Sequence, residues 1–208
     1  MIIENIEYSD KYNLIRITIS GEKFFIDYDL YYENSLEKGK EIDFSLYKEI
    51  LANDEFNRAK NFALNKISYS QKSTYEIKKK LRDKDFSEDI IKKIIAYLDS
   101  YGFIDDEAYV KAYIRDKDEI SKWSRGKISH MLKRKHIDER LIEDYIYQID
   151  DKREVEKARF FADKKIKNDF SYENRVKVFR HLAGKGFDID IINQVLDDRF
   201  SWCTLYIS

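Results

Sequence analysis

The chain has 208 residues, a formal net charge of −1, one cysteine and no proline. The single cysteine, Cys203, excludes an internal disulfide and is typical of a protein kept in a reducing compartment, so we expect a cytoplasmic location. The chain neither opens on a basic segment with an apolar run nor contains a stretch approaching 18 apolar residues. It therefore predicts neither a signal peptide nor a membrane span.

Charge is distributed unevenly along the chain. Residues 1–56 carry 6 basic and 13 acidic side chains, a net charge of −7. Residues 57–150 carry 21 basic and 17 acidic side chains, and residues 151–208 carry 12 and 10. An acidic N-terminal part therefore precedes a mildly basic remainder.

The acidic part shows the period-two alternation of β-strands. Apolar residues alternate over residues 15–19 and again over residues 24–30, and Gly21 lies between the two stretches. Glycine at the first central position of a two-residue turn predicts a type II′ hairpin. A hairpin alone is marginally stable, so we expect residues 2–8 to add a third strand. From Asp43 the pattern becomes helical.

The rest of the chain contains the same pattern three times. Leu81, Leu132 and Leu182 are 51 and 50 residues apart, and each has an aliphatic residue four positions before it and an apolar residue five positions after it. An apolar pair follows in every copy. Before that pair the sequence reads Phe86-Ser87, Ile137-Asp138 and Phe187-Asp188, in which an apolar residue precedes a helix N-cap, as in a hydrophobic staple. Periods of this length are typical of arrays of supersecondary units.

Two alanines four residues apart precede each copy and predict a helix with a closely packed face. These pairs are Ala59 and Ala63, Ala108 and Ala112, and Ala158 and Ala162. Each unit is therefore predicted to contain three helices, with a tight turn between the last two. A unit of about 50 residues buries little apolar surface, so stacked units are expected to share contacts.

The sequence thus predicts a mainly α protein. We expect three tandem three-helix, helix-turn-helix-like repeats in an elongated curved array, with a small N-terminal antiparallel β hairpin or sheet. The expected parts are an N-terminal β-rich extension leading into a helix (1–53), the repeats (54–104, 105–150 and 151–200) and a C-terminal tail (201–208).

The central repeat resembles that of the RecX family of recombination regulators. The run Gly102-Phe103-Ile104-Asp105-Asp106 opens it, and the resemblance continues through Tyr109, Ala112, Tyr113, Arg115, Gly126, Ile128, Leu132, Lys135 and Ile137. The flanking repeats resemble those of the family, so the likeness covers about residues 57–198. Two residues depart from the family pattern: Lys127 stands where proline often follows Gly126, and His136 stands where glycine is frequent.

The resemblance implies a non-enzymatic regulator that binds the RecA recombinase, chiefly as its filament on single-stranded DNA. Such a protein would lie along the filament groove and restrain strand exchange and ATP turnover. We expect a monomer that needs no cofactor, has no membrane partner and binds double-stranded DNA at most non-specifically.

Basic residues recur at equivalent places in the repeats, where they would meet phosphates or an acidic protein surface without reading sequence. For any single lysine, a solvated helix face is the alternative. The candidates for binding the filament or DNA are Arg115, Lys117, Lys122, Arg125, Lys127, Lys133, Arg134, Lys135, Lys78, Lys79, Arg82, Arg175, Lys177 and Arg180.

Aromatic residues of the central repeat have two interpretations. Tyr109 and Tyr113 would stack on bases or, as we favour, pack in the core between repeats, whereas Trp123 is the better candidate for an exposed ring.

The other chemistry-bearing residues favour structural roles. The acidic run Asp105-Asp106-Glu107 precedes a helix and is interpreted as capping rather than metal binding. The three histidines have no zinc spacing, and the Gly184-Lys185-Gly186 segment lacks the phosphate-loop pattern. No catalytic constellation is apparent, so we expect no enzymatic activity and no metal.

Two other functions are compatible with a helical-repeat array. A DNA-binding regulator would read bases with the last helix of a unit, but residues 139–150 are predominantly acidic. A protein scaffold without a nucleic-acid role is the other alternative.

Overall fold

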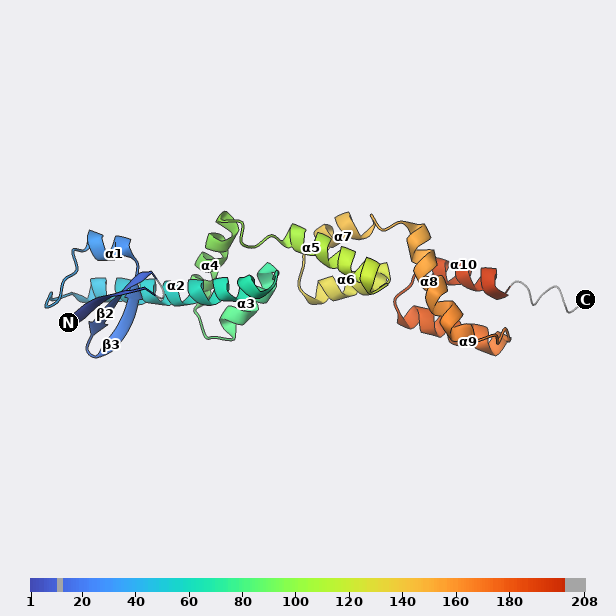
Figure 1. Ribbon diagram of the computed structural model, residues 1–208, viewed down its shortest axis with the longest axis horizontal. Helices are drawn as coiled ribbons and strands as arrows, with labels where there is room; N and C mark the ends of the chain where they lie inside the picture. Colours follow the sequence, from blue (N-terminus) through green and yellow to red (C-terminus); the bar gives the residue numbers. More distant parts are fainter. Residues whose placement is uncertain (11–12, 201–208) are drawn as a thin grey trace, which may run out of the picture. The chain divides into compact units, whose positions relative to one another are not determined.

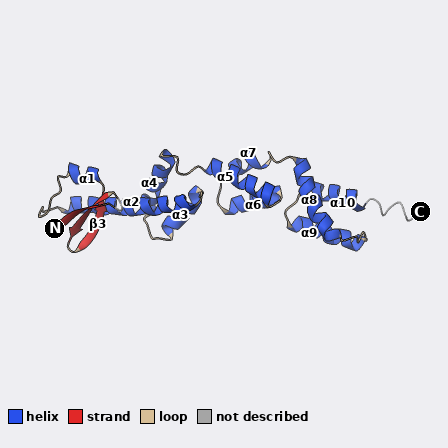
Figure 2. Ribbon diagram, in the orientation of Figure 1, coloured by secondary structure: helices blue, strands red, loops and turns tan. Residues whose placement is uncertain are grey.

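The structure, a computed structural model, describes residues 1–10 and 13–200 (Figure 1). Cys203 and the predicted tail therefore lie outside the described residues. The chain forms two compact units, one comprising residues 1–105 and the other beginning at Asp106. Strands are confined to the N-terminal part of the first unit, and helices make up most of the remaining described chain (Figure 2).

A three-stranded antiparallel sheet opens the first unit, as predicted. Its strands β1 (Ile3–Ser9), β2 (Leu14–Ile19) and β3 (Glu22–Ile26) lie in sequence order, and Ile17 pairs with Ile6 on one side and with Phe24 on the other.

The type of the hairpin turn differs from the prediction. Ile19 pairs with Glu22, so Ser20 and Gly21 are the two central residues. Both have positive φ, which is the pattern of a type I′ turn rather than type II′. Gly21 is therefore the second central residue of the turn.

The second alternating stretch is also shorter than predicted. Strand β3 ends at Ile26, and Tyr28 and Leu30 belong to the short helix α1 (Tyr28–Glu33). The Asp27 carboxylate accepts the Leu30 N–H at 3.0 Å and caps this helix. An N-cap aspartate thus overrides a strand-like alternation of apolar residues.

Helix α2 (Phe44–Tyr69) runs from the N-terminal extension into the first repeat without a break, through the predicted boundary at residue 53. Its polar side chains cover the free edge of β3. Asp54 accepts the Phe25 N–H at 2.8 Å, and Asn57 donates to the Phe25 carbonyl at 3.2 Å. Asp54 and Asn57 are buried because they complete the hydrogen bonding of an edge strand, which otherwise exposes unpaired backbone groups.

The three repeats have three α-helices each, as predicted. Repeat 1 contains α2, α3 and α4, repeat 2 contains α5, α6 and α7, and repeat 3 contains α8, α9 and α10. Their bounds, beyond α2, are Thr74–Arg82, Glu88–Ser100, Asp106–Arg115, Arg125–Arg134, Glu139–Ile146, Asp151–Ile166, Tyr172–Gly184 and Ile189–Phe200. A single π-helical turn, η1 (Asp116–Ile120), follows α5. Each repeat has its own core around its leucine, namely Leu81, Leu132 or Leu182.

The turn between the last two helices has the same backbone in each repeat. Four residues after the leucine, the chain adopts a left-handed conformation at Asp85 (φ 59°), His136 (φ 53°) and Gly186 (φ 81°). The next residue donates its N–H to the leucine carbonyl at 3.3 Å in all three repeats. A left-handed backbone position favours glycine. His136 stands at such a position, which is also where glycine is frequent in the family.

The alanine pairs are buried in only two of the repeats. Ala59 and Ala63 lie in the core of repeat 1, as do Ala158 and Ala162 in repeat 3. In repeat 2, Ala108 and Ala112 are half-buried, and α5 instead buries Tyr109, Val110 and Ile114. The prediction of a closely packed alanine face is therefore wrong for α5, where larger side chains fill the interface.

Replacing Asp85 with glycine tests the cost of the left-handed turn. A non-glycine residue in this conformation costs roughly 1–2 kcal/mol, less for aspartate, while glycine loses more backbone entropy on folding. We therefore expect Asp85→Gly to raise the free energy of unfolding by roughly 0.5 kcal/mol in urea, followed by circular dichroism. Lys92→Gly, an exposed change within α4, should instead lower it by roughly 0.7 kcal/mol. A destabilised Asp85→Gly variant would contradict this account.

Candidate functional site

Three of the candidate lysines gather around three aromatic rings of repeat 2. We call this set the cation–aromatic strip; its members are Tyr109, Tyr113, Trp123, Lys117, Lys127 and Lys135. The ammonium of Lys127 lies 3.9 Å from the Trp123 ring centroid, and that of Lys117 lies 5.3 Å from it. The Lys135 ammonium lies 5.8 Å from the Tyr113 ring. These distances are typical of cation–π contacts.

Local structure brings these residues together. Tyr109 and Tyr113 are one turn apart on α5, with ring centroids 6.1 Å apart and an interplanar angle of 23°. After η1 the chain folds back, and the Trp123 N–H donates to the Lys117 carbonyl at 2.9 Å. Lys127 is in the first turn of α6, and Lys135 is its C-cap.

The rings of the strip are mainly a packing element. Tyr109 is buried in the core of repeat 2, while Tyr113 and Trp123 are half-buried and pack against it. Burial raises the pKa of the Tyr113 hydroxyl, although Lys135 and Lys117 oppose this shift. Both tyrosines thus pack in the core of repeat 2 rather than between repeats as predicted, and the exposed Lys127 is held over the Trp123 ring.

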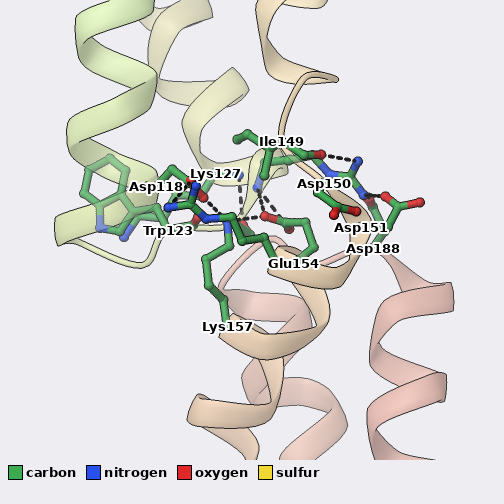
Figure 3. Close-up of polar contacts among 12 residues, drawn as sticks. Asp118, Trp123, Lys127, Ile149, Asp150, Asp151, Glu154, Lys157 and Asp188 are labelled. Atoms are coloured by element: carbon green, nitrogen blue, oxygen red, sulfur yellow. Dashed lines mark hydrogen bonds and ion pairs between the residues drawn. The ribbon is translucent and has the colours of Figure 1, made fainter.

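Arg125, two residues before Lys127, is engaged differently. Its guanidinium donates to Asp151 at 2.6 Å and to the Ile149 carbonyl at 3.4 Å, and it lies 4.0 Å from Asp188 (Figure 3). Its side chain is only 14% exposed. These contacts join α6 of repeat 2 to the N-terminal end of α8 and to the turn between α9 and α10 of repeat 3, so a structural role accounts for Arg125.

A buried ion cluster lies beside Arg125 between the two repeats. The Lys157 ammonium of α8 donates to the Asp118 carboxylate of η1 at 2.6 Å and also contacts Glu154 (Figure 3). It donates further to the Trp123 carbonyl at 2.8 Å, which ties the strip to the cluster. The Glu154 carboxylate accepts the Arg125 N–H, where a negative charge is favoured by the positive end of α6.

The backbones of repeats 2 and 3 approach closely at two glycines. A Cβ on Gly126 would lie 2.5 Å from the Gly186 carbonyl oxygen, which no side chain allows. Nearby, the Ser124 hydroxyl donates to the Lys185 carbonyl at 2.7 Å while it caps α6 by accepting the Lys127 N–H. We call these contacts, together with those of Arg125 and Lys157, the repeat junction.

The remaining candidate cations have different surroundings. Three of them form ion pairs with exposed acids: Arg82 with Glu88, Lys133 with Glu139 and Arg175 with Asp197. The ammonium of Lys122 lies 5.4 Å from the Phe160 ring. Among the described residues, no hydrogen bond or ion pair is formed by the side chains of Lys78, Lys79, Arg115, Arg134, Lys177 and Arg180.

Lys78, Lys79 and Arg82 are on α3 of the first unit, whereas the other candidates belong to the second unit. The structure thus gathers into the cation–aromatic strip only Lys117, Lys127 and Lys135 of the candidate cations.

Sequence reasoning missed the buried charges of the repeat junction. Glu154 and Lys157 share the helical face of α8 that also carries Ala158, so their place in a buried stripe was a usable signal. Asp118 carried no such signal, because it lies in a π-helical turn beside two other acidic residues, Asp116 and Glu119.

Within residues 1–10 and 13–200, the structure contains no group of three or more His, Cys, Asp or Glu side chains arranged to hold a metal. No helix in the described part of the chain is long and apolar enough to cross a bilayer. Glu107, in the first turn of α5, accepts a hydrogen bond from Lys111, and this bond together with one from Tyr145 lowers the pKa of its carboxyl.

Comparison with known proteins agrees with this architecture. Family models for the first, second and third three-helix domains of RecX match residues 59–98, 105–146 and 152–196. A regulatory protein RecX of Clostridium perfringens (strain 13 / Type A) is 34% identical over 194 residues, covering 89% of this chain and 91% of that protein. One from Clostridioides difficile (strain 630) is 33% identical over 202 residues and 94% of each chain.

Solved structures are similar as well. A crystal structure of regulatory protein RecX superposes with a TM-score of 0.79 and 26% identity, over 94% of this chain and 98% of the other. The crystal structure of RecX from Lactobacillus salivarius gives a TM-score of 0.66 and 32% identity, over 72% of this chain and 98% of the other.

The fold and site define a helical-repeat protein of three three-helix domains that carries a cationic, aromatic strip on its central domain. With its domain matches and relatives, the chain belongs to the RecX family of regulatory proteins.

Removing the Lys157 charge tests the repeat junction. Lys157→Met would leave Asp118 and Glu154 buried without their shared cation, and breaking a buried ion pair costs about 3–5 kcal/mol. We expect a loss of this size in the free energy of unfolding, measured in urea by tryptophan fluorescence. Lys152→Met, an exposed change on the same helix, should stay within about 0.5 kcal/mol of the parent. Equal stability of the two variants would argue against the junction.

Proposed function

We propose that this chain regulates the RecA recombinase by binding its filament on single-stranded DNA, and that it restrains strand exchange and ATP hydrolysis without catalysing a reaction itself. The single observation that carries this proposal is the similarity to RecX regulatory proteins across 94% of the chain. Three family domains in the expected order support the same assignment.

Helix α6 of repeat 2 supplies a surface suited to such a target. Lys127 and Arg134 are exposed on α6, and neither forms an ion pair among the described residues. Ammonium and guanidinium groups of this kind neutralise phosphates and release counterions without reading the base sequence. A regulator that acts along a nucleoprotein filament needs this kind of sequence-independent contact.

The last helix of repeat 2 disfavours a regulator that reads duplex sequence. A recognition helix presents polar side chains to the base edges of the major groove. Helix α7 instead exposes Glu139, Glu143 and Asp144, which would face phosphates with like charge. We therefore retain the filament as the target.

The proposed regulation is tested by titrating the purified chain into RecA, single-stranded DNA and ATP. We expect the rates of ATP hydrolysis and strand exchange to fall in a saturable manner as the chain is added. A parallel titration into RecA with ATP but no DNA shows whether the filament is required. Unchanged rates at saturating chain would refute the proposal.

Neutralising three cations of α6 tests the binding surface. We choose Lys127→Gln, Lys133→Gln and Arg134→Gln together, and leave Arg125 in place because it belongs to the repeat junction. Each lost phosphate contact should flatten the dependence of log affinity on log salt by about 0.7 on single strands, so the triple variant should bind the filament more weakly and with less salt dependence.

A matched triple variant provides the control for the α6 set. Lys23→Gln, Lys38→Gln and Lys48→Gln also removes three exposed positive charges, but from the N-terminal extension. We expect this variant to keep the parent salt dependence. If the two variants bind alike, the effect reflects net charge and the α6 surface is not the contact.

A further inference from the structure

An exposed series of aromatic rings lies on the first unit. We call Tyr97, Tyr101 and Phe103 the ring ladder. The Tyr97 and Tyr101 centroids are 4.7 Å apart, and the Tyr101 and Phe103 rings are 6.1 Å apart and within 20° of parallel. Tyr101 is 65% exposed and Phe103 is 45% exposed. Two large flat side chains are thus kept side by side in solvent.

The end of α4 builds the ladder. Tyr97 and Tyr101 are one helical turn apart, so both project from the same side of α4. Gly102 then takes a left-handed conformation, with φ 66°, and the Phe103 N–H donates back to the Leu98 carbonyl at 2.8 Å. This helix-ending turn reverses the chain and places the Phe103 ring beside that of Tyr101.

Packing of the first unit does not account for the two outer rings. The residue after Phe103, Ile104, is the one that enters the core of repeat 1. Tyr97 is half-buried and contacts Phe56 of α2 edge-on, with centroids 6.2 Å apart, so it anchors the inner end of the ladder. Tyr101 and Phe103 extend from this anchor into solvent.

Positive charge lies next to the ladder. The Lys60 ammonium of α2 is 5.8 Å from the Tyr97 ring centroid and 5.7 Å from that of Phe56. Lys93 is exposed one turn before Tyr97 on α4, on the same side of that helix. Flat rings beside ammonium groups complement a ligand that alternates flat bases with phosphates.

We propose that the ring ladder is a stacking platform for the bases of single-stranded DNA, with Lys60 and Lys93 contacting the adjoining phosphates. Stacking on tyrosine and phenylalanine tolerates any base, because each base has a π-face. The lysines favour a nucleic acid over an apolar protein segment, which would gain nothing from them. The inference rests on the proposed function in one respect, because it assumes that the bound strand is the single-stranded DNA of the filament.

The test separates stacking from phosphate contact by removing bases. Binding of the full chain to a fluorescent oligothymidylate is compared with binding to an abasic strand of equal length and charge. We expect the parent chain to prefer the strand with bases by about tenfold, since stacking on an aromatic ring contributes roughly 1–3 kcal/mol per base. The double variant Tyr101→Ala with Phe103→Ala should lose this preference and bind both strands equally.

Two further variants control for folding and for ring chemistry. Tyr69→Ala with Tyr172→Ala removes two tyrosines that are 81% and 80% exposed elsewhere, and it should keep the preference for bases. Tyr101→Trp with Phe103→Trp retains flat rings and should also keep it. Circular dichroism should match the parent for all variants, because the replaced rings are largely in solvent.

The outcomes distinguish this inference from the proposed function. Equal affinity of the parent chain for the two strands, or an unchanged preference in the alanine variant, overturns the ladder as a stacking platform. An alanine variant that binds DNA normally but no longer binds the RecA filament would assign the ring ladder to protein docking. That outcome would also overturn the ladder as a stacking platform. Failure of the parent chain to alter RecA turnover, by contrast, refutes the proposed regulation while the oligonucleotide comparison stands.

Discussion

The second unit depends on one buried cation. The Lys157 ammonium is shared by Asp118 of repeat 2 and Glu154 of repeat 3, and it also binds the Trp123 carbonyl. A lone ammonium at this depth would be strongly disfavoured. Asp118 also pairs with Arg153 of α8 at 3.1 Å, and Glu154 also accepts the Arg125 N–H. These charges are therefore paired across repeats 2 and 3, which makes the relative position of the two repeats a condition for burying them.

This constraint connects packing to the proposed binding surface. The Trp123 ring lies beneath the ammonium groups of Lys117 and Lys127, and the Trp123 backbone carbonyl accepts a hydrogen bond from Lys157. Arg125 serves the junction and Lys127 faces solvent, although both occupy the first turn of α6. The same segment thus joins two repeats and presents charge to a partner, and these roles are divided between neighbouring residues.

In the first unit, one helix packs against both the sheet and the core of repeat 1. Helix α2 supplies polar groups to the edge of β3 through Asp54 and Asn57 and then supplies Ala59 and Ala63 to the core of repeat 1. The sheet and repeat 1 therefore belong to one compact unit. The aromatic side chains that this packing does not require remain at the far end of α4, where they are available to a partner.

Much of this protein was readable from its sequence. The leucine spacing and the apolar residues before the N-caps follow from local rules, so the repeats and the tight turns between their last two helices could be predicted. The fate of individual charges could not. Arg125 and Lys127 look equivalent in the sequence, and only the approach of α8 buries the first and leaves the second exposed. Whether a charged side chain is buried depends on which distant segments pack against it, and the local sequence pattern does not specify those segments.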